Sequence, residues 1–459
     1  MIRLFNLYFP TRTIVLLGGE IATICASFAL AIFIRFGADS STVFYGGHAF
    51  RKIIAVTALA LLCSFFMEMY DSPRQAKPGE MYPRILTLVG ILSFLIAGLT
   101  YFIPGFVVGR NVFLTGLCIL SLAWILWRWA YGKLIFLPAL RERVYLLGDG
   151  ERAKRLLESI RTRGELGMDL VGWTGEASSN EDATRESFGG VLRKLASQGS
   201  VDRVIVALKD RRSAMPVKEL LELRLNGIHI DDGTALLEKI FGQVEVDELH
   251  PSWLIFGEGF RLTQPHRFLR PVFSVFLGLI LSILTLPLIP IIVIVIKLSS
   301  PGPVLYRQKR VGLRGRVFKC CKFRTMQSNA EAVSGPTWAS DDDPRITKVG
   351  KFLRRTRLDE IPQLWNVLRG EMEFVGPRPE RPEFVEWLTR EIPYYQLRQT
   401  VAPGVTGWAQ VCYKYGNTIE DAKEKLRYDL FYIKNMSVSL DLWILFQTVK
   451  TVLFGEGAL

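Results

Sequence analysis

The chain has 459 residues, of which 49% are hydrophobic and 22% are charged. This composition excludes an intrinsically disordered chain, and the length suggests about three structural units. The 57 lysines and arginines outnumber the 44 aspartates and glutamates, and the net charge of +13 favours an anionic partner, with a membrane face favoured by the apolar composition.

Four apolar runs in residues 1–135 predict transmembrane helices, because a helix needs about 20 apolar residues to cross a bilayer. The alternative is a buried helical core, which window hydropathy disfavours. Basic residues after the last run place its exit in the cytoplasm, and four crossings then place the N-terminus there too. The runs cover residues 14–34, 53–67, 85–109 and 111–127.

Residues 140–250 predict an α/β module, because short apolar strands alternate with helical patterns. The strands are expected at 144–147, 170–173 and 201–208, with helices at 153–161, 190–198 and 216–226. The turn from Gly148 to Ala153 resembles part of a Rossmann dinucleotide-binding fingerprint, but no ribose-binding acid follows at the expected spacing. A dinucleotide site and a structural or regulatory module therefore both remain open, and the second is favoured.

A fifth apolar run follows a linker at 251–270. Residues 271–296 carry no charge, but Pro287 and Pro290 lie within them and should break or kink a helix. The break leaves halves of about 16 and 9 residues, or roughly 24 and 14 Å. Neither half crosses a hydrocarbon core of about 30 Å comfortably. The pattern fits either a helix that enters and leaves by one face, at 271–298, or a kinked span.

The cysteines and histidines do not indicate a metal centre. The six cysteines and four histidines lack metal-ligand spacing, so we expect neither a zinc site nor a histidine-centred catalytic cluster.

A strongly basic stretch at 301–360 ends in a pair of carboxylates. It holds 14 lysines and arginines against six acids, a net charge of +8, and it closes with Asp359 and Glu360. Neighbouring arginines at 354, 355 and 357 predict low pKa values for both carboxylates, which suits a nucleophile or a metal ligand. An ion pair on a helix surface is the commoner explanation of such a pair taken alone.

An arginine between two prolines follows the pair. Arg378 lies in a Gly-Pro-Arg-Pro loop, and a guanidinium on so stiff a loop suits bidentate phosphate binding.

The ordered set of motifs resembles the bacterial polyprenyl-phosphate sugar-1-phosphate transferases, also called monotopic phosphoglycosyl transferases. The resemblance covers about 266–459. Four spans followed by an α/β module are similar to the long-chain branch of that family, the priming enzymes of exopolysaccharide and O-antigen synthesis. The motifs lie at 307–312, 322–326, 343–347, 358–363, 376–379 and 403–407.

The resemblance implies an activity and roles for individual residues. The family transfers a sugar-1-phosphate from a UDP-sugar to a polyprenyl phosphate such as undecaprenyl phosphate, and releases UMP through a covalent aspartyl intermediate. Asp359 then corresponds to the nucleophile and Glu360 to a ligand of Mg²⁺. The resemblance and the positive charge of the motifs assign substrate binding to Arg354, Arg378, Lys322 and Arg324.

The resemblance also favours re-entry for the fifth run. Family members carry a proline-broken helix that penetrates one leaflet, and the break here corresponds to Leu286-Pro287, where leucine replaces the family's frequent serine. UDP-sugars are cytoplasmic, so a full crossing after four spans would separate Asp359 from its donor. The catalytic domain at 299–459 is therefore expected on the cytoplasmic face of a bacterial inner membrane.

The expected fold is a membrane protein of mixed α and α/β class, with a four-helix transmembrane bundle, a cytoplasmic Rossmann-like module and a C-terminal catalytic domain. Residues 417–453 predict amphipathic helices that either lie in the membrane interface or pack against that domain. A non-catalytic assembly protein and a transporter are the rival functions. Nucleic-acid binding is disfavoured because no binding module is present, and a homodimer through the α/β module is left open.

Overall fold

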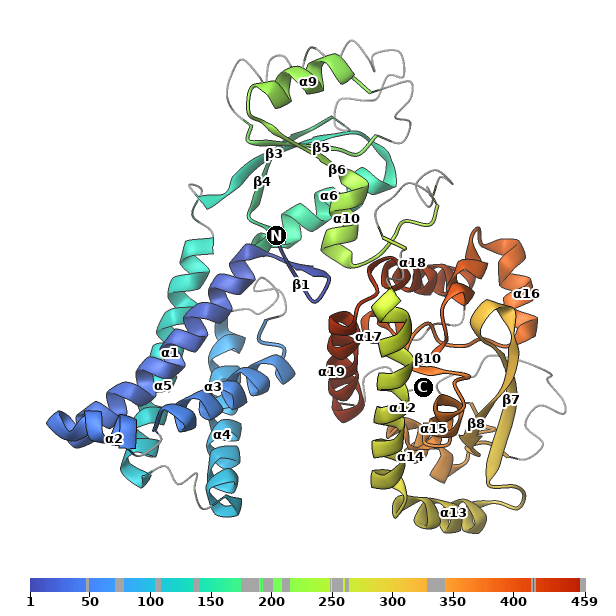
Figure 1. Ribbon diagram of the computed structural model, residues 1–459. Helices are drawn as coiled ribbons and strands as arrows, with labels where there is room; N and C mark the ends of the chain where they lie inside the picture. Colours follow the sequence, from blue (N-terminus) through green and yellow to red (C-terminus); the bar gives the residue numbers. More distant parts are fainter. Residues whose placement is uncertain are drawn as a thin grey trace. The chain divides into compact units, whose positions relative to one another are not determined.

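The computed structural model divides the chain into two compact units (Figure 1). The first unit comprises Met1–Ile2 and Tyr8–Leu236, and the second comprises Arg3–Leu7 and Leu237–Leu459. The structure describes residues 1–46, 49–70, 78–103, 109–135, 137, 140–174, 190, 192, 201–208, 215–247, 249, 259–260, 264–327, 343–413, 416 and 418–454.

After two short strands, β1 (Ile2–Leu4) and β2 (Leu7–Phe9), the chain forms the long apolar helices of the first unit, and each of the four predicted runs overlaps one of them. Buried side chains such as Leu92 and Trp124 form their common core, while Phe94 and Leu122 on the outer faces are exposed. Apolar residues on both faces are typical of helices surrounded by lipid. The helices are α1 (Thr11–Phe36), the short α2 (Ser40–Gly46), α3 (Ala49–Phe66), α4 (Pro78–Phe102) and α5 (Arg110–Ile135).

The one charge in the first apolar run is fully paired inside this unit. Glu20 is buried, and its two carboxylate oxygens contact the Arg128 guanidinium and the Tyr70 hydroxyl, the latter at 2.6 Å. Arg128 also donates to the carbonyl of Met69 at 2.7 Å. Because an unpaired charge among apolar helices is expensive, these contacts explain how the chain tolerates Glu20 there. The transporter alternative needed a polar cavity at this residue, and its closed pairing gives that alternative no support.

The α/β module carries a parallel four-stranded sheet with the order β4-β3-β5-β6. The predicted strands are present, although the third is shorter than expected, and the predicted helix at 190–198 lies mostly outside the described residues. Strand β6 and helix α10 were not predicted, because the short polar segment of β6 carries no strand pattern. The elements are β3 (Glu142–Leu147), α6 (Gly150–Thr162), β4 (Met168–Trp173), β5 (Arg203–Val206), α9 (Val217–Leu225), β6 (His229–Asp232) and α10 (Gly233–Phe241).

The glycine turn of this module closes onto its own sheet. Gly148 has φ +135°, and a Cβ there would lie 2.6 Å from the backbone of Ala207. Its N–H donates to the Thr174 hydroxyl at 2.8 Å, and its carbonyl accepts from the Trp173 indole at 2.7 Å. The glycine is therefore needed for close packing, which supports the structural interpretation of the turn.

The second unit contains the basic stretch and its motifs. A β-hairpin, a parallel strand pair and several helices surround the segment that bears Asp359 and Glu360 (Figure 1). The elements are α12 (Gln264–Thr285), α13 (Leu288–Ser299), β7 (Leu305–Val311), β8 (Val317–Phe323), α14 (Lys348–Arg355), η8 (Leu358–Glu360), α15 (Gln363–Leu368), β9 (Glu373–Val375), α16 (Pro382–Glu391), η9 (Tyr395–Thr400), β10 (Gly404–Thr406), α17 (Trp408–Cys412), α18 (Ile419–Asn435) and α19 (Val438–Phe454).

The fifth apolar run forms two helices that meet at a sharp corner (Figure 1). Helix α12 ends at Thr285 and α13 begins at Leu288, so the predicted break residues Leu286 and Pro287 lie between them. The helices have 22 and 12 residues, or about 33 and 18 Å, which corrects the shorter halves expected from the sequence. Within the described residues α12 is one of five helices long and apolar enough to cross a membrane, so the prediction that neither half suffices is wrong for α12.

The extra length of α12 has a physical cause. The helix continues back past the uncharged run to Gln264, through Pro271 and the charged Arg270. Arg270 is buried and donates to Asp441 at 2.9 Å and to the Tyr432 hydroxyl at 2.6 Å. Counting only uncharged residues missed this part of the helix, because the pairing that allows a buried arginine comes from distant segments.

Helix α18 belongs to the core of the second unit. Leu426, Leu430 and Phe431 on this helix are at most 1% exposed, and the charged Asp429 is buried as well. The alternating pattern of this segment therefore reflects packing within the domain rather than contact with the membrane interface. Helix α19 differs, because it keeps apolar side chains such as Val449 exposed.

Candidate active site

The carboxylate pair lies on a short 3-10 turn between two helices. Helix α14 is capped by Thr347, whose hydroxyl accepts from the N–H of Gly350 at 2.9 Å, and it ends at Arg355. Arg357 then adopts a left-handed conformation with φ +58°, which turns the chain into η8. Asp359 and Glu360 are thereby placed inside the domain, at 6% and 9% exposure.

Glu360 is held by two cations from distant motifs. The Lys322 ammonium, on β8, donates to its Oε1 at 2.8 Å, and the Arg378 guanidinium donates to the same oxygen at 3.2 Å. Burial opposes ionisation of Glu360, but the charges of Lys322, Arg378 and Arg357 outweigh it and hold its pKa well below the ordinary value. The second oxygen, Oε2, accepts no hydrogen bond from the residues that the structure describes.

Asp359 differs from its neighbour. Burial raises the pKa of Asp359, and the adjacent Glu360 charge raises it further, against the opposing charges of Lys322 and Arg354. The prediction of a low pKa for both carboxylates is therefore wrong for Asp359, because arginines nearby in sequence do not remove the desolvation penalty. Arg355, for example, is exposed at the surface and does not offset the burial of Asp359. Across the described ranges, no side chain or N–H donates to the Asp359 carboxylate.

Arg354 and Arg324 have different surroundings. Arg354 donates to the Thr325 hydroxyl at 2.9 Å and lies close enough to lower the pKa of Asp359, while its role in substrate binding stays a prediction. Arg324 donates to the carbonyls of Pro301 and Ser300, both at 2.7 Å. These bonds tie the segment after α13 to the end of β8 and give Arg324 a structural role that does not involve the carboxylate pair.

The loop that carries Arg378 packs against a second glycine segment. The N–H of Gly376 donates to Thr406 at 2.9 Å, and the N–H of Gly404 donates to Pro377 at 3.0 Å. A Cβ on Gly404 would lie 2.1 Å from the Gly376 nitrogen, so only glycine fits. This close approach explains why the motifs at 376–379 and 403–407 occur together.

A buried arginine supports the same loop from η9. Arg398 donates to the main-chain carbonyl of Arg378 at 3.0 Å and to the Tyr395 hydroxyl at 2.6 Å. Its guanidinium also lies 2.8 Å from Asp429, a residue of α18 that is 2% exposed in its side chain. The burial of this ion pair and the bond from Arg398 to the Arg378 carbonyl fix the backbone of the loop that carries Arg378.

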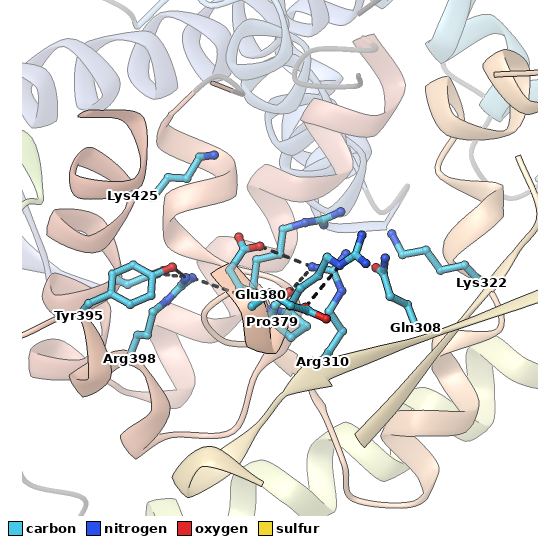
Figure 2. A network of polar contacts seen from close by, with 12 residues as sticks. Gln308, Arg310, Lys322, Pro379, Glu380, Tyr395, Arg398 and Lys425 are labelled. Atoms are coloured by element: carbon cyan, nitrogen blue, oxygen red, sulfur yellow. Dashed lines mark hydrogen bonds and ion pairs between the residues drawn. The ribbon is translucent and has the colours of Figure 1, made fainter. Parts of the chain in front are cut away.

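Arg310 reaches the loop from β7 (Figure 2). It donates to the carbonyl of Pro379 at 2.9 Å and lies 3.5 Å from Glu380, while Gln308 accepts from it at 2.6 Å. In Figure 2, Arg310 and Arg398 approach the Pro379–Glu380 segment from opposite sides. The sequence motif contained Arg310 without giving it a role, and Arg398 and Asp429 were missed because no local pattern links residues so far apart.

The carboxylate oxygens of this pair fit a magnesium ion whose remaining ligands come from the substrate and from water. Within the described residues there is no group of three or more histidine, cysteine, aspartate or glutamate side chains that could hold a metal. Mg²⁺ commonly binds one or two carboxylates together with substrate phosphates and waters. Within the described residues, Oε2 of Glu360 and the Asp359 carboxylate accept no hydrogen bond, so they meet that requirement.

Comparison with known proteins identifies the family. Residues 265–455 match the profile of the family described as bacterial sugar transferase. The UDP-N-acetylgalactosamine-undecaprenyl-phosphate N-acetylgalactosaminephosphotransferase of Aeromonas hydrophila is 43% identical over 222 residues, which cover 48% of this chain and about half, 51%, of that protein. The undecaprenyl-phosphate glucose phosphotransferase of Komagataeibacter xylinus is 29% identical over 454 residues, covering 89% of this chain and 84% of that protein.

A third relative covers much of both chains. The UDP-glucose:undecaprenyl-phosphate glucose-1-phosphate transferase of Escherichia coli is 34% identical over 325 residues, 67% of this chain and 67% of its own. These matches extend the similarity from the motifs around Asp359 to both compact units. The chain therefore belongs to the bacterial sugar transferases, and it is a phosphoglycosyl transferase of the polyprenyl-phosphate sugar-1-phosphate transferase family.

Proposed function

We propose that this protein transfers a sugar-1-phosphate from a UDP-sugar to undecaprenyl phosphate and releases UMP, as the first membrane step of exopolysaccharide or O-antigen synthesis. The observation that carries the proposal is the buried pair of Asp359 and Glu360, in which Lys322 and Arg378 hold only one oxygen of Glu360. The names of the relatives support undecaprenyl phosphate as acceptor and a UDP-sugar as donor.

The first step uses Asp359 as the nucleophile. Its ionised carboxylate attacks the sugar-bearing phosphorus of the donor, the new oxygen–phosphorus bond forms, and the bond to the bridging oxygen breaks as UMP leaves. A raised pKa makes this carboxylate more nucleophilic once it is ionised. Lys322, Arg354 and Arg378 neutralise the repulsion between the carboxylate and the anionic phosphates.

The second step regenerates the enzyme. An acceptor phosphate oxygen attacks the same phosphorus, the aspartyl bond breaks, and Asp359 returns as a carboxylate while the lipid keeps the sugar-1-phosphate. Glu360 would hold Mg²⁺ through its Oε2, and the ion would supply further neutralisation of phosphate charge.

We propose that α12 and α13 enter and leave the inner membrane by its cytoplasmic face. The outer faces of both helices are apolar, with Phe276 and Ile283 on α12 and Leu298 on α13 at least 61% exposed. The start of α12 is fastened to α18 and α19 through Arg270, while its end lies beside Glu360. One domain that contacts both ends of α12 lies on one side of the bilayer, which supports a re-entrant rather than a crossing helix. A homodimer through the α/β module stays a prediction.

The test is a donor panel with purified membranes. The membranes are incubated with undecaprenyl phosphate and, separately, UDP-glucose, UDP-galactose and UDP-N-acetylgalactosamine, and UMP release is measured. We expect release with at least one donor, dependent on acceptor for turnover. A folded protein that releases UMP with none of the UDP-sugars would favour the non-catalytic alternative.

A further inference from the structure

An apolar cavity opens beside the carboxylate pair. It lies between the end of α12, the segment from η8 to α15, and the second half of α19, and it measures about 210 Å³. Neither the catalytic pair nor the cationic loop requires such a space.

The lining of the cavity combines two charged residues, one glutamine, Gln410, and several threonines with apolar side chains. Glu360 and Arg357 are its charged lining residues within the described part of the chain, and both belong to the segment that bears the catalytic pair. Side chains such as Leu281, Leu364 and Val452 line the rest. A ligand that fits this lining carries an anionic head and a hydrocarbon body.

The threonines in the lining behave as apolar groups. The hydroxyl of Thr285 donates to the carbonyl of Leu281 at 2.7 Å, and that of Thr451 donates to the carbonyl of Gln447 at 3.2 Å. Because the helix backbone satisfies these hydroxyls, their methyl groups are free to meet a ligand. Apart from the Gln410 amide, whose Oε1 accepts no hydrogen bond within the described residues, the walls offer few partners to the hydroxyls of a sugar or nucleotide and therefore favour hydrocarbon.

The position of the cavity connects the active site to the lipid phase. Its α12 wall belongs to the helix whose other face exposes Phe276 and Ile283. The cations that hold Glu360, Lys322 and Arg378, come from segments outside the α12–α19 walls. A donor and a lipid acceptor can therefore reach the carboxylate pair from different directions.

We propose that this α12–α19 cavity binds the isoprene units next to the phosphate of the polyprenyl acceptor, with the phosphate at Arg357 and the chain running between α12 and α19 into the bilayer. The inference rests on the proposed function, because it assumes that the acceptor is a polyprenyl phosphate. It adds where the isoprenoid chain of the acceptor lies and which residues contact it.

Matched tryptophan substitutions test the cavity. Leu281→Trp and Thr451→Trp fill it from its two walls, whereas Ile283→Trp and Val449→Trp add the same bulk to exposed positions of the same helices. Each protein is purified in phosphatidylglycerol nanodiscs with undecaprenyl phosphate and with whichever of UDP-glucose, UDP-galactose and UDP-N-acetylgalactosamine the parent uses.

We expect the two cavity variants to raise the KM for undecaprenyl phosphate by about tenfold or more, the scale of losing a methylene-sized contact. The KM for the donor should stay within about twofold, and the exposed-site variants should change neither constant by more than that. An unchanged acceptor KM in both cavity variants, or an equal rise in the exposed-site variants, overturns the inference. If the parent protein transfers sugar-1-phosphate from none of the three UDP-sugars, that result instead refutes the proposed function.

A second measurement uses the unmodified protein, so it does not depend on the variants folding. A polyprenyl phosphate with a photoreactive diazirine on its first isoprene unit is activated in the nanodiscs, and labelled peptides are mapped by mass spectrometry. Labelling at the end of α12 or in α19 that undecaprenyl phosphate suppresses, and that added phosphatidylglycerol does not, supports the inference. Labelling absent from both helices, or suppressed equally by phosphatidylglycerol and therefore reflecting bulk lipid, contradicts it.

Discussion

The two compact units each bury a glutamate against an arginine, but the two clusters differ in what they leave open. In the first unit both oxygens of Glu20 are bonded, to Arg128 and to Tyr70. In the second unit Glu360 uses one oxygen for both of its cations, and the neighbouring Asp359 accepts no hydrogen bond within the described ranges. A closed cluster stabilises the fold, whereas an open one can bind and react.

The largest expected effect is the loss of the open carboxylate. Asp359→Asn should lower transfer by more than about 10³-fold, the scale seen when a covalent nucleophile is removed, because an amide does not attack phosphorus. UMP release measures the effect. Asp202→Asn, on the surface of the α/β module, removes the same charge and should keep parent activity. A folded Asp359→Asn protein with more than a few percent of parent turnover contradicts the covalent role.

A substitution in the Glu20–Arg128 cluster should lower the stability of the protein without changing its catalytic turnover. Arg128→Met leaves Glu20 buried without its counter-ion, and breaking one side of a buried pair costs about 3–5 kcal/mol. We expect a clear drop in Tm in detergent, with turnover per folded molecule unchanged. An unchanged Tm, or a selective loss of turnover in fully folded protein, would contradict the assignment of a stabilising role to the Glu20 cluster.

Metal dependence sharpens the contrast at Glu360. Glu360→Gln removes the charge that would hold Mg²⁺, so we expect a higher magnesium requirement and a lower maximal rate. Excess chelator should abolish turnover of the parent. Activity measured across a magnesium titration checks both results, and full activity of the parent in chelator removes the metal from the mechanism.

The smallest expected effect lies behind the Arg378 loop. Arg398→Lys keeps the positive charge but removes the guanidinium that bonds both the Arg378 carbonyl and the Tyr395 hydroxyl. The KM for the donor should therefore rise about tenfold, which corresponds to the loss of one charged hydrogen bond. Arg427→Lys on α18 is the control, because it alters another buried arginine pair of the same unit. It should leave the donor KM unchanged.

A double-mutant cycle separates positioning from general loss of structure. If Arg398 acts through Arg378, the Arg398→Lys change should have little further effect in an Arg378→Lys background. Additive effects on the donor KM would show that Arg398 acts independently of the loop.

Local sequence patterns predicted the parts of the molecule that depend on neighbouring residues. The apolar runs overlap helices, the α/β alternation gave three of the four strands, and the interruption at Leu286-Pro287 coincides with the corner between α12 and α13. The proline signal is local, because the ring removes a donor and clashes with the preceding turn whatever lies nearby.

Features that depend on distant partners were not predictable in this way. Helix α12 extends past Arg270 because Asp441, far along the chain, neutralises it. The raised pKa of Asp359 arises from burial, which adjacent arginines in the sequence could not reveal. The pairing of Arg398 with Asp429 likewise exists only once η9 and α18 have packed together.

The most direct test of the central claim, that the buried carboxylate of Asp359 is the nucleophile, is isolation of the covalent intermediate. The protein is incubated with its UDP-sugar labelled in the sugar, without acceptor, then denatured and analysed by mass spectrometry. The account predicts one sugar-phosphate adduct on the peptide that carries Asp359, lost when undecaprenyl phosphate is added before denaturation and absent from Asp359→Asn. An adduct that persists in that variant, or an active parent that never forms one, would contradict it.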